Sequence, residues 1–335
     1  MDYGWGRSFV FFLSEYLRTS PAQSRLHAAW VYALESREIE PAGEQLPENS
    51  EPACRLSSLL VICHCLSIYY RIRFVESIRM ASELDDVKRE VAAANRVLAN
   101  LGLATGLTAA LGHASMRVPS QPHHFFVKGR EYEFDALAIM EPDDMVMCNT
   151  DGFLVAARAG LTQCSEVKIH ACIYKLRPDF NAVVHVHPRY TILMSVLTGT
   201  LKPMRQEGAQ LLRWPLPIYP HVKTIQNDDE GMEVADLLGT HSAILLRGHG
   251  AVTAGKNVSE AVMSMAHLEE QAQINYLAYC AAGKDYPYLR DDVLDEMLNR
   301  TPLYEQPHFK DVLKGREPQR DGIWNFQKRA AARPQ

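Results

Sequence analysis

The stretch that decides the fold runs Ala182-Val183-Val184-His185-Val186-His187-Pro188. A short apolar run rich in valine and closed by proline is typical of a buried strand. Alternate residues of a strand point to the same face, so His185 and His187 are predicted to project side by side at its end. Because neutral imidazole nitrogens bind divalent metals at about 2.0–2.1 Å, the pair indicates a metal site. Two histidines on a half-exposed strand would show the same pattern.

A second stretch, Ala243-Ile244-Leu245-Leu246-Arg247-Gly248-His249-Gly250, supplies a third histidine. It is predicted to be a buried strand that ends in a turn, with His249 between two glycines. Glycine lets the backbone approach a site closely, so His249 could join His185 and His187 in a three-histidine site. The alternative is a turn histidine that faces solvent.

A carboxylate precedes these strands in the segment from Ser165 to Leu176, which is predicted to be a helix that ends before Pro178. Glu166 falls in its first turn. Beside a metal, Glu166 could move a proton to or from a bound substrate or water. A glutamate there would equally well complement the helix dipole.

The whole chain has the composition of a globular protein, with 335 residues, 47% hydrophobic and 22% charged. The net charge of −5 argues against nucleic acid or an anionic membrane as a main partner. Seven cysteines with no CxxC pair indicate reduced thiols and a cytoplasmic protein. The most apolar run, Leu59 to Tyr70, is shorter than the roughly 20 residues that cross a bilayer, so it is predicted to be a buried helix.

Three regions are predicted along the chain. Residues 1–80 form an N-terminal extension of unknown role, disordered or the product of a start placed too early, since Met80 directly precedes the next region. Residues 81–289 form the catalytic domain, which opens with a helix that begins at Ser82 and its acidic neighbours. Residues 290–335 form a C-terminal tail.

From about residue 84 to about residue 285, the motifs follow the order and spacing of the class II aldolase/adducin family. The chain resembles that family in Gly112-His113-Ala114-Ser115-x-Arg117, Ser165-Glu166-x3-His170, Arg177-Pro178-Asp179, the His185-x-His187 strand and Gly248-His249-Gly250. The resemblance implies a three-layer αβα sandwich around a mixed, largely antiparallel sheet. It also implies one divalent metal on His185, His187 and His249, with Glu166 as the catalytic acid/base. Zinc is the first expectation, with manganese, iron or cobalt as alternatives. Family members are usually homotetramers with sites at subunit interfaces.

Departures from the family's sugar-phosphate aldolases narrow the expected substrate. Their phosphate is held by Gly-Asn, Thr-Gly and paired-serine segments, whereas this chain has Gly112-His113 at the first position and Cys164-Ser165 at the last. The family's active-site tyrosine is not evident. The Gly-His-x-Ser-x-Arg pattern resembles the decarboxylase branch instead. The residues expected to bind the substrate are His113, Ser115, Arg117, Lys128 and Ser165.

The sequence therefore predicts a metal-dependent carbon–carbon lyase, favoured as a decarboxylase of a small hydroxy or oxo carboxylate. Three alternatives remain open. They are a sugar-phosphate aldolase or epimerase, an iron-dependent oxygenase on the same scaffold, and an adducin-like interaction protein without catalysis.

Overall fold

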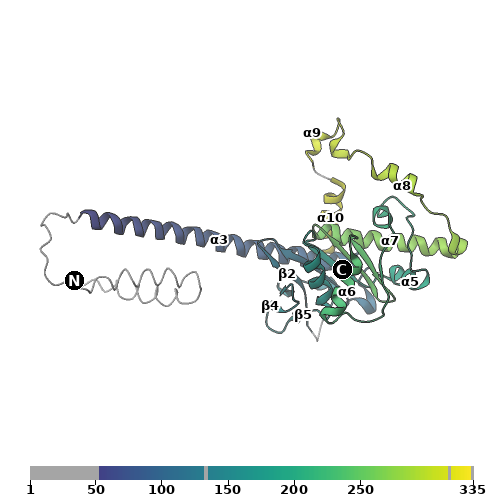
Figure 1. Cartoon of the computed structure of the whole chain (residues 1–335), viewed down its shortest axis with the longest axis horizontal. Coiled ribbons are helices and arrows are strands. Elements are labelled where there is room, and N and C mark those ends of the chain that lie inside the picture. Colours follow the sequence, from purple (N-terminus) through teal and green to yellow (C-terminus); the bar gives the residue numbers. More distant parts are fainter. Residues whose placement is uncertain (1–52, 132–134, 316–317, 333–335) are drawn as a thin grey trace. The chain divides into compact units, whose positions relative to one another are not determined.

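The computed structural model describes residues 53–131, 135–315 and 318–332 (Figure 1). The chain divides into two compact units, residues 1–71 and residues 72–335. Residues 1–52 of the expected N-terminal extension lie outside the described part of the chain, so the expectation that they are disordered stays a prediction. The borders expected near residues 80 and 290 stay predictions.

The first described element is the helix α3 (Ala53–Asn100). It contradicts the prediction of a helix start at Ser82. The segment contains neither glycine nor proline, so no backbone preference interrupts it at Ser82 and its acidic neighbours. The run from Leu59 to Tyr70 is helical, as predicted, although its burial falls outside the described side chains. Among the described helices, none is long and apolar enough to cross a membrane.

The other elements belong to residues 101–335. The strands are β1 (His113–Val118), β2 (Gln121–Arg130), β3 (Met145–Asn149), β4 (Leu154–Ala156), β5 (Thr162–Gln163), β6 (Ala182–Val186), β7 (Ile218–Tyr219), β8 (Ala243–Leu246) and β9 (Gly250–Gly255). The helices are α4 (Val167–Leu176), α5 (Arg189–Leu197), α6 (Asp228–Leu238), α7 (Val258–Ala282), α8 (Asp291–Leu298), α9 (Lys310–Leu313) and α10 (Pro318–Ala331).

All of these strands belong to one nine-stranded sheet. Its order is β4-β3-β2-β1-β6-β9-β8-β7, and β5 pairs with β2. Every pair is antiparallel except the parallel pair of β7 and β8. The valine-rich strand β6, which carries His185, lies near the centre of the sheet between β1 and β9. The prediction of a mixed, largely antiparallel sheet is confirmed.

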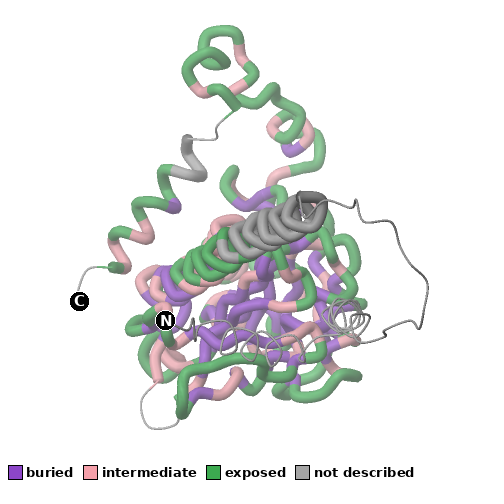
Figure 2. Tube along the Cα trace, turned by 90° about the vertical axis from the view of Figure 1, so that its left-hand side faces the viewer, coloured by how far each residue is buried: buried purple, intermediate pink, exposed green. Residues whose placement is uncertain are grey.

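Helices cover both faces of the sheet. On one face, α4 and α6 pack with Val183 and Ile244 in a buried apolar cluster. On the other face, α5, α7 and the last turns of α3 pack with Val184 and Leu245. Neighbouring residues of each strand thus enter opposite layers, as strand geometry requires. The buried residues lie in the sheet and in the helical faces against it (Figure 2), and the predicted αβα sandwich is confirmed.

Candidate metal centre

Two of the predicted ligands lie where β6 ends. His185 is fully buried within β6, and His187 follows the strand's last residue, with its ring centroid 4.9 Å from that of His185. The two Nε2 atoms are 3.0 Å apart. The Nδ1 atom of His185 lies 3.0 Å from the carbonyl oxygen of Ala251, which can only accept, so this nitrogen carries the proton. The other ring nitrogen of His185, Nε2, therefore faces the cluster.

The third histidine is delivered by the turn between β8 and β9. Because β6 and β9 pair with Val186 opposite Ala251, the turn residue His249 lies beside His187, with ring centroids 4.9 Å apart. The close approach requires glycine at position 250. A Cβ atom there would lie 2.5 Å from the carbonyl oxygen of Val186 and 2.9 Å from the His187 ring.

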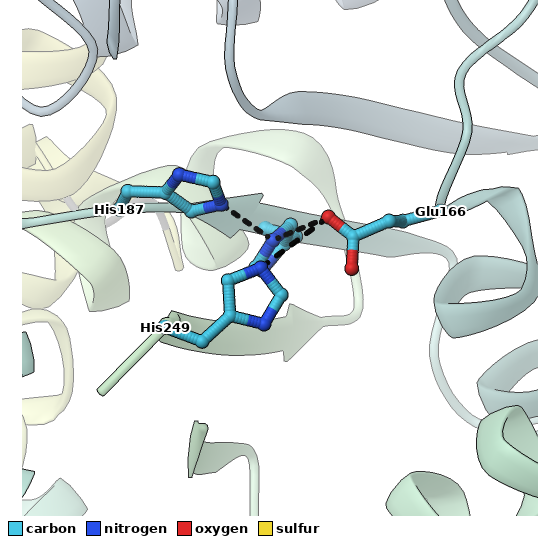
Figure 3. Close-up of side chains that lie close together, drawn as sticks. Glu166, His187 and His249 are labelled. Carbon is cyan, nitrogen blue, oxygen red and sulfur yellow. Dashed lines mark hydrogen bonds and ion pairs between the residues drawn. The ribbon is translucent and has the colours of Figure 1, made fainter. Parts of the chain in front are cut away.

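The predicted acid/base reaches the cluster from the opposite side. Glu166 immediately precedes α4, and its carboxylate faces the imidazoles of His187 and His249 (Figure 3). Its Oε2 atom lies 3.3 Å from Nε2 of His185 and 3.5 Å from Nε2 of His249. Its Oε1 atom accepts a hydrogen bond of 2.9 Å from the backbone N–H of Ile225. That bond fixes one carboxylate oxygen and directs the other toward the histidines.

These four side chains fit a divalent cation. Two ligands bound at about 2.0–2.1 Å with tetrahedral geometry are roughly 3.3 Å apart. The separations of 3.0, 3.3 and 3.5 Å between the ligand atoms bracket that spacing. The buried Nδ1 atom of His249 has no hydrogen-bond partner among the described residues, and its Nε2 atom is the ring nitrogen that approaches the cluster. The donor set of imidazoles and a carboxylate suits zinc, manganese, iron or cobalt.

Burial sets the protonation of the cluster. It lowers the pKa of His187 to about 3, helped by the adjacent His185 and His249, so this imidazole is neutral near pH 7. Burial alone would raise the pKa of Glu166. Attraction and hydrogen bonding to His185 and His249 outweigh that effect and hold the pKa below its usual range. His187 is therefore neutral and Glu166 is ionised near pH 7, the protonation state that metal ligation requires of each group.

Two of the expected substrate residues line the same face of the sheet. His113 pairs directly with His185 across β1 and β6, and their ring centroids are 5.3 Å apart. Ser115 follows two residues later and is fully buried, with hydrogen-bond partners on α4. His113 thus borders the cluster, whereas Ser115 lies one step behind it.

Lys128 and Arg117, which were also expected to bind the substrate, are buried and contact other groups of the protein. Lys128 is 2% exposed, and its Nζ atom lies 2.8 Å from the Asp135 carboxylate. The guanidinium of Arg117 donates to the backbone carbonyls of Phe180 and Tyr174 at 3.3 and 2.9 Å. Both side chains brace the sheet through these contacts.

Ser165, the last expected substrate residue, is exposed beside Glu166. Its hydroxyl lies 3.2 Å from Nη1 of Arg130, which brings a partly exposed cation next to the site. Arg130 is a further cation of the segment that holds Lys128, whereas the Ile225 N–H reaches the site through tertiary folding and is not marked in the sequence. His170 stands in the Ser165-Glu166-x3-His170 motif without an assigned role, and Tyr174 was missed; their spacing of four and eight residues from Glu166 places both on one helical face.

The chain is similar to proteins of a known family, in sequence and in fold. The profile described as the Class II Aldolase and Adducin N-terminal domain matches residues 89–276. A 3,4-dihydroxyphthalate decarboxylase of Arthrobacter keyseri is 30% identical over 209 residues, which are 60% of this chain and 82% of the relative. An L-fuculose phosphate aldolase of Methanococcus maripaludis is 28% identical over 146 residues, which are 42% of this chain and 74% of the relative.

Solved structures show the same fold. The L-fuculose 1-phosphate aldolase of Glaciozyma antarctica superposes with a TM-score of 0.59 at 23% identity, covering 75% of this chain and 90% of that one. Together, the decarboxylase and aldolase relatives and the shared fold indicate a lyase. Since the profile matches more than half of its 335 residues, this chain belongs to the class II aldolase and adducin family.

Proposed function

We propose that this protein is a divalent-metal-dependent decarboxylase of a small carboxylate with a neighbouring hydroxyl or oxo group. The observation that carries the proposal is the convergence of His185, His187 and His249 with the buried carboxylate of Glu166. An interaction protein has no need for such a cluster. Decarboxylases among the relatives favour loss of carbon dioxide over aldol cleavage.

In the proposed site, the three histidines would hold the cation and leave one coordination position for the substrate, and Glu166 would stand beside it as the acid/base. When bound, the cation supplies a Lewis acid that offsets negative charge on substrate oxygens. The ionised Glu166 takes the proton of the substrate hydroxyl and returns it to the carbon that loses its carboxylate. The carbon–carboxylate bond breaks, its electron pair stays on that carbon to receive the proton, and carbon dioxide leaves. The product hydroxyl regains a proton from water.

Charge around the site supports a carboxylate substrate. Arg130 is the partly exposed cation beside Ser165 and Glu166, whereas the ion pair with Asp135 occupies Lys128. We therefore propose Arg130, Ser165 and His113 as the side chains that orient the substrate, with Ser115, Arg117 and Lys128 acting behind them. A phosphate cradle would need more hydroxyl and amide donors at this position.

Several finer properties belong to the same proposal. We expect zinc as the resident metal, a homotetramer with sites at its subunit interfaces, and a location in the cytoplasm. Elemental analysis and light scattering of the purified full chain test the first two expectations directly.

The experiment that tests the function follows carbon dioxide release from 3,4-dihydroxyphthalate and related hydroxylated aromatic acids. We expect turnover that a chelator abolishes and added metal restores. Glu166→Gln keeps the shape but removes the proton carrier, so turnover should fall by about 10²–10⁴-fold. The matched control is Glu270→Gln, an exposed carboxylate paired with Arg205, which should leave the rate unchanged. Full turnover of metal-loaded Glu166→Gln, cleavage of a phosphorylated ketose alone, or oxygen consumption with iron(II) would each contradict the proposal.

A further inference from the structure

A line of hydrogen-bonded side chains runs from the inner face of α4 to the histidine cluster. The Tyr174 hydroxyl lies 2.8 Å from Oγ of Ser115, which lies 2.6 Å from Nδ1 of His170. Nε2 of His170 then lies 2.6 Å from Nδ1 of His113. All four side chains are buried, and the line ends with the His113 ring beside His185.

Counting donors gives this line a direction. Either hydroxyl could be the donor in the contact between Tyr174 and Ser115; because Ser115 is the acceptor that the described residues offer to the Tyr174 proton, we assign Tyr174 as the donor. The single hydroxyl proton of Ser115 then goes to Nδ1 of His170 at 2.6 Å, because the carbonyl of Val183 is 3.4 Å away. Since Nδ1 of His170 accepts, its proton lies on Nε2 and is donated to Nδ1 of His113. Neutral His113 must therefore carry its own proton on Nε2.

Both imidazoles of the line are neutral. Burial lowers the pKa of His170 to about 3, and Nδ1 of His113 accepts from His170, so the His113 ring carries a single proton. Nothing among the described residues accepts a hydrogen bond from Nε2 of His113, so this N–H is available to a ligand.

The same histidines form a hydrogen bond rather than a second metal site. Ligand atoms of His113, Cys164 and His170 all lie within 4.8 Å of one another, as in a metal cluster. However, the 2.6 Å between the two histidine nitrogens is well below the roughly 3.3 Å that separates two ligands of one tetrahedral ion. Burial also raises the pKa of the Cys164 thiol, which disfavours the thiolate that a metal needs.

We propose that Tyr174, Ser115 and His170 are positioning residues that fix the tautomer of His113, so that its Nε2–H donates to the substrate carboxylate. Only the identity of that ligand rests on the proposed function. A neutral donor suits decarboxylation, because the carboxylate loses its charge as carbon dioxide leaves.

The tautomer can be measured without any substrate. In the full-length protein labelled with ¹⁵N-histidine, the His113 resonances are assigned by their loss in His113→Asn. We expect a protonated Nε2 and an unprotonated Nδ1. Ser115→Ala removes the hydroxyl that donates to His170 and should yield a mixture of His113 tautomers, whereas Ser115→Thr should restore the wild-type state. The control Tyr219→Phe removes another buried hydroxyl, bonded to Glu233, and should change nothing.

Turnover provides the second readout. We expect kcat/KM to fall about tenfold in Ser115→Ala, the value of one lost hydrogen bond of about 1.4 kcal/mol, with unchanged metal content. A wild-type His113 protonated on Nδ1, or a Ser115→Ala protein with the wild-type tautomer, would overturn the inference even if the protein is a decarboxylase. Conversely, the expected tautomers in a protein that releases no carbon dioxide would refute the proposed function and leave the relay intact.

Discussion

Glu269 on α7 is expected to hold the metal centre in place through α5, the helix whose first turn its carboxylate contacts. Its carboxylate accepts hydrogen bonds from the backbone N–H groups of Tyr190 and Thr191 at 2.9 and 2.8 Å, and from the Thr191 hydroxyl at 2.7 Å. These groups lie in the first turn of α5, where backbone N–H groups lack partners within the helix. Since α5 begins two residues after His187, the contact anchors that ligand as well.

The cost of removing the contact follows from these bonds. A hydrogen bond to a charged group contributes roughly 1.5–3 kcal/mol. Burial raises the pKa of Glu269, which shows that desolvation of the carboxylate offsets part of that gain. Glu269→Ala leaves two N–H groups of the first turn unpaired, so we expect it to lower the free energy of unfolding by about 2–4 kcal/mol. Glu269→Gln keeps one acceptor oxygen and should cost about 1–2 kcal/mol.

Urea unfolding followed by circular dichroism, together with titration of metal into chelator-treated protein, measures both effects. Metal affinity should fall in the order wild type, Glu269→Gln, Glu269→Ala. The adjacent Glu270→Ala is the control, since its carboxylate is half exposed and its ion pair with Arg205 is worth less than about 1 kcal/mol. A Glu269→Ala protein as stable as Glu270→Ala, with unchanged metal affinity, would refute the reasoning.

Two further predictions concern pH and packing. Burial lowers the pKa of His170 to about 3, so below pH ~6.5 the unfolded chain takes up a proton that the folded protein excludes. The contribution of His170 to the free energy of unfolding should therefore be constant above pH ~6.5. Below that pH, the free energy of unfolding should fall by up to about 1.4 kcal/mol per pH unit until pH 3 is reached. His170→Asn should make the slope shallower, and an unchanged slope would contradict the assignment. Gly250→Ala places a Cβ atom 2.5 Å from the carbonyl oxygen of Val186 and should cost about 1–3 kcal/mol and weaken metal binding, whereas Gly322→Ala, with open space around it, should do neither. Equal thermal stability of the two alanine variants would count against the packing argument.

The histidine cluster could be predicted because local rules determine it. Period-two alternation places the side chains of His185 and His187 on the same face of the chain, and glycine on both sides of His249 marks a close turn. Adjacency of β6 and β9 then follows from the family resemblance, and the structure provides the register. The αβα layers were likewise implied by the family resemblance.

Features that depend on distant pairing were not predictable. Lys128 is a cation in the right segment, yet the sequence cannot show that Asp135 neutralises it. The N–H of Ile225 that orients Glu166 belongs to a loop 59 residues away. The start of α3 was misplaced because Ser82 and its acidic neighbours resemble a cap, although a helix without glycine or proline can continue through them.

The proposed function requires that His185, His187 and His249 bind one divalent cation on which decarboxylation depends, with Glu166 as the acid/base beside it. The most direct test is isothermal titration of the chelator-treated full chain with zinc, alongside His249→Ala. We expect one high-affinity zinc site per chain in the wild-type protein. In His249→Ala, the zinc affinity should fall at least tenfold, and the release of carbon dioxide should be lost with it. Zinc affinity that is the same in both proteins would contradict this expectation.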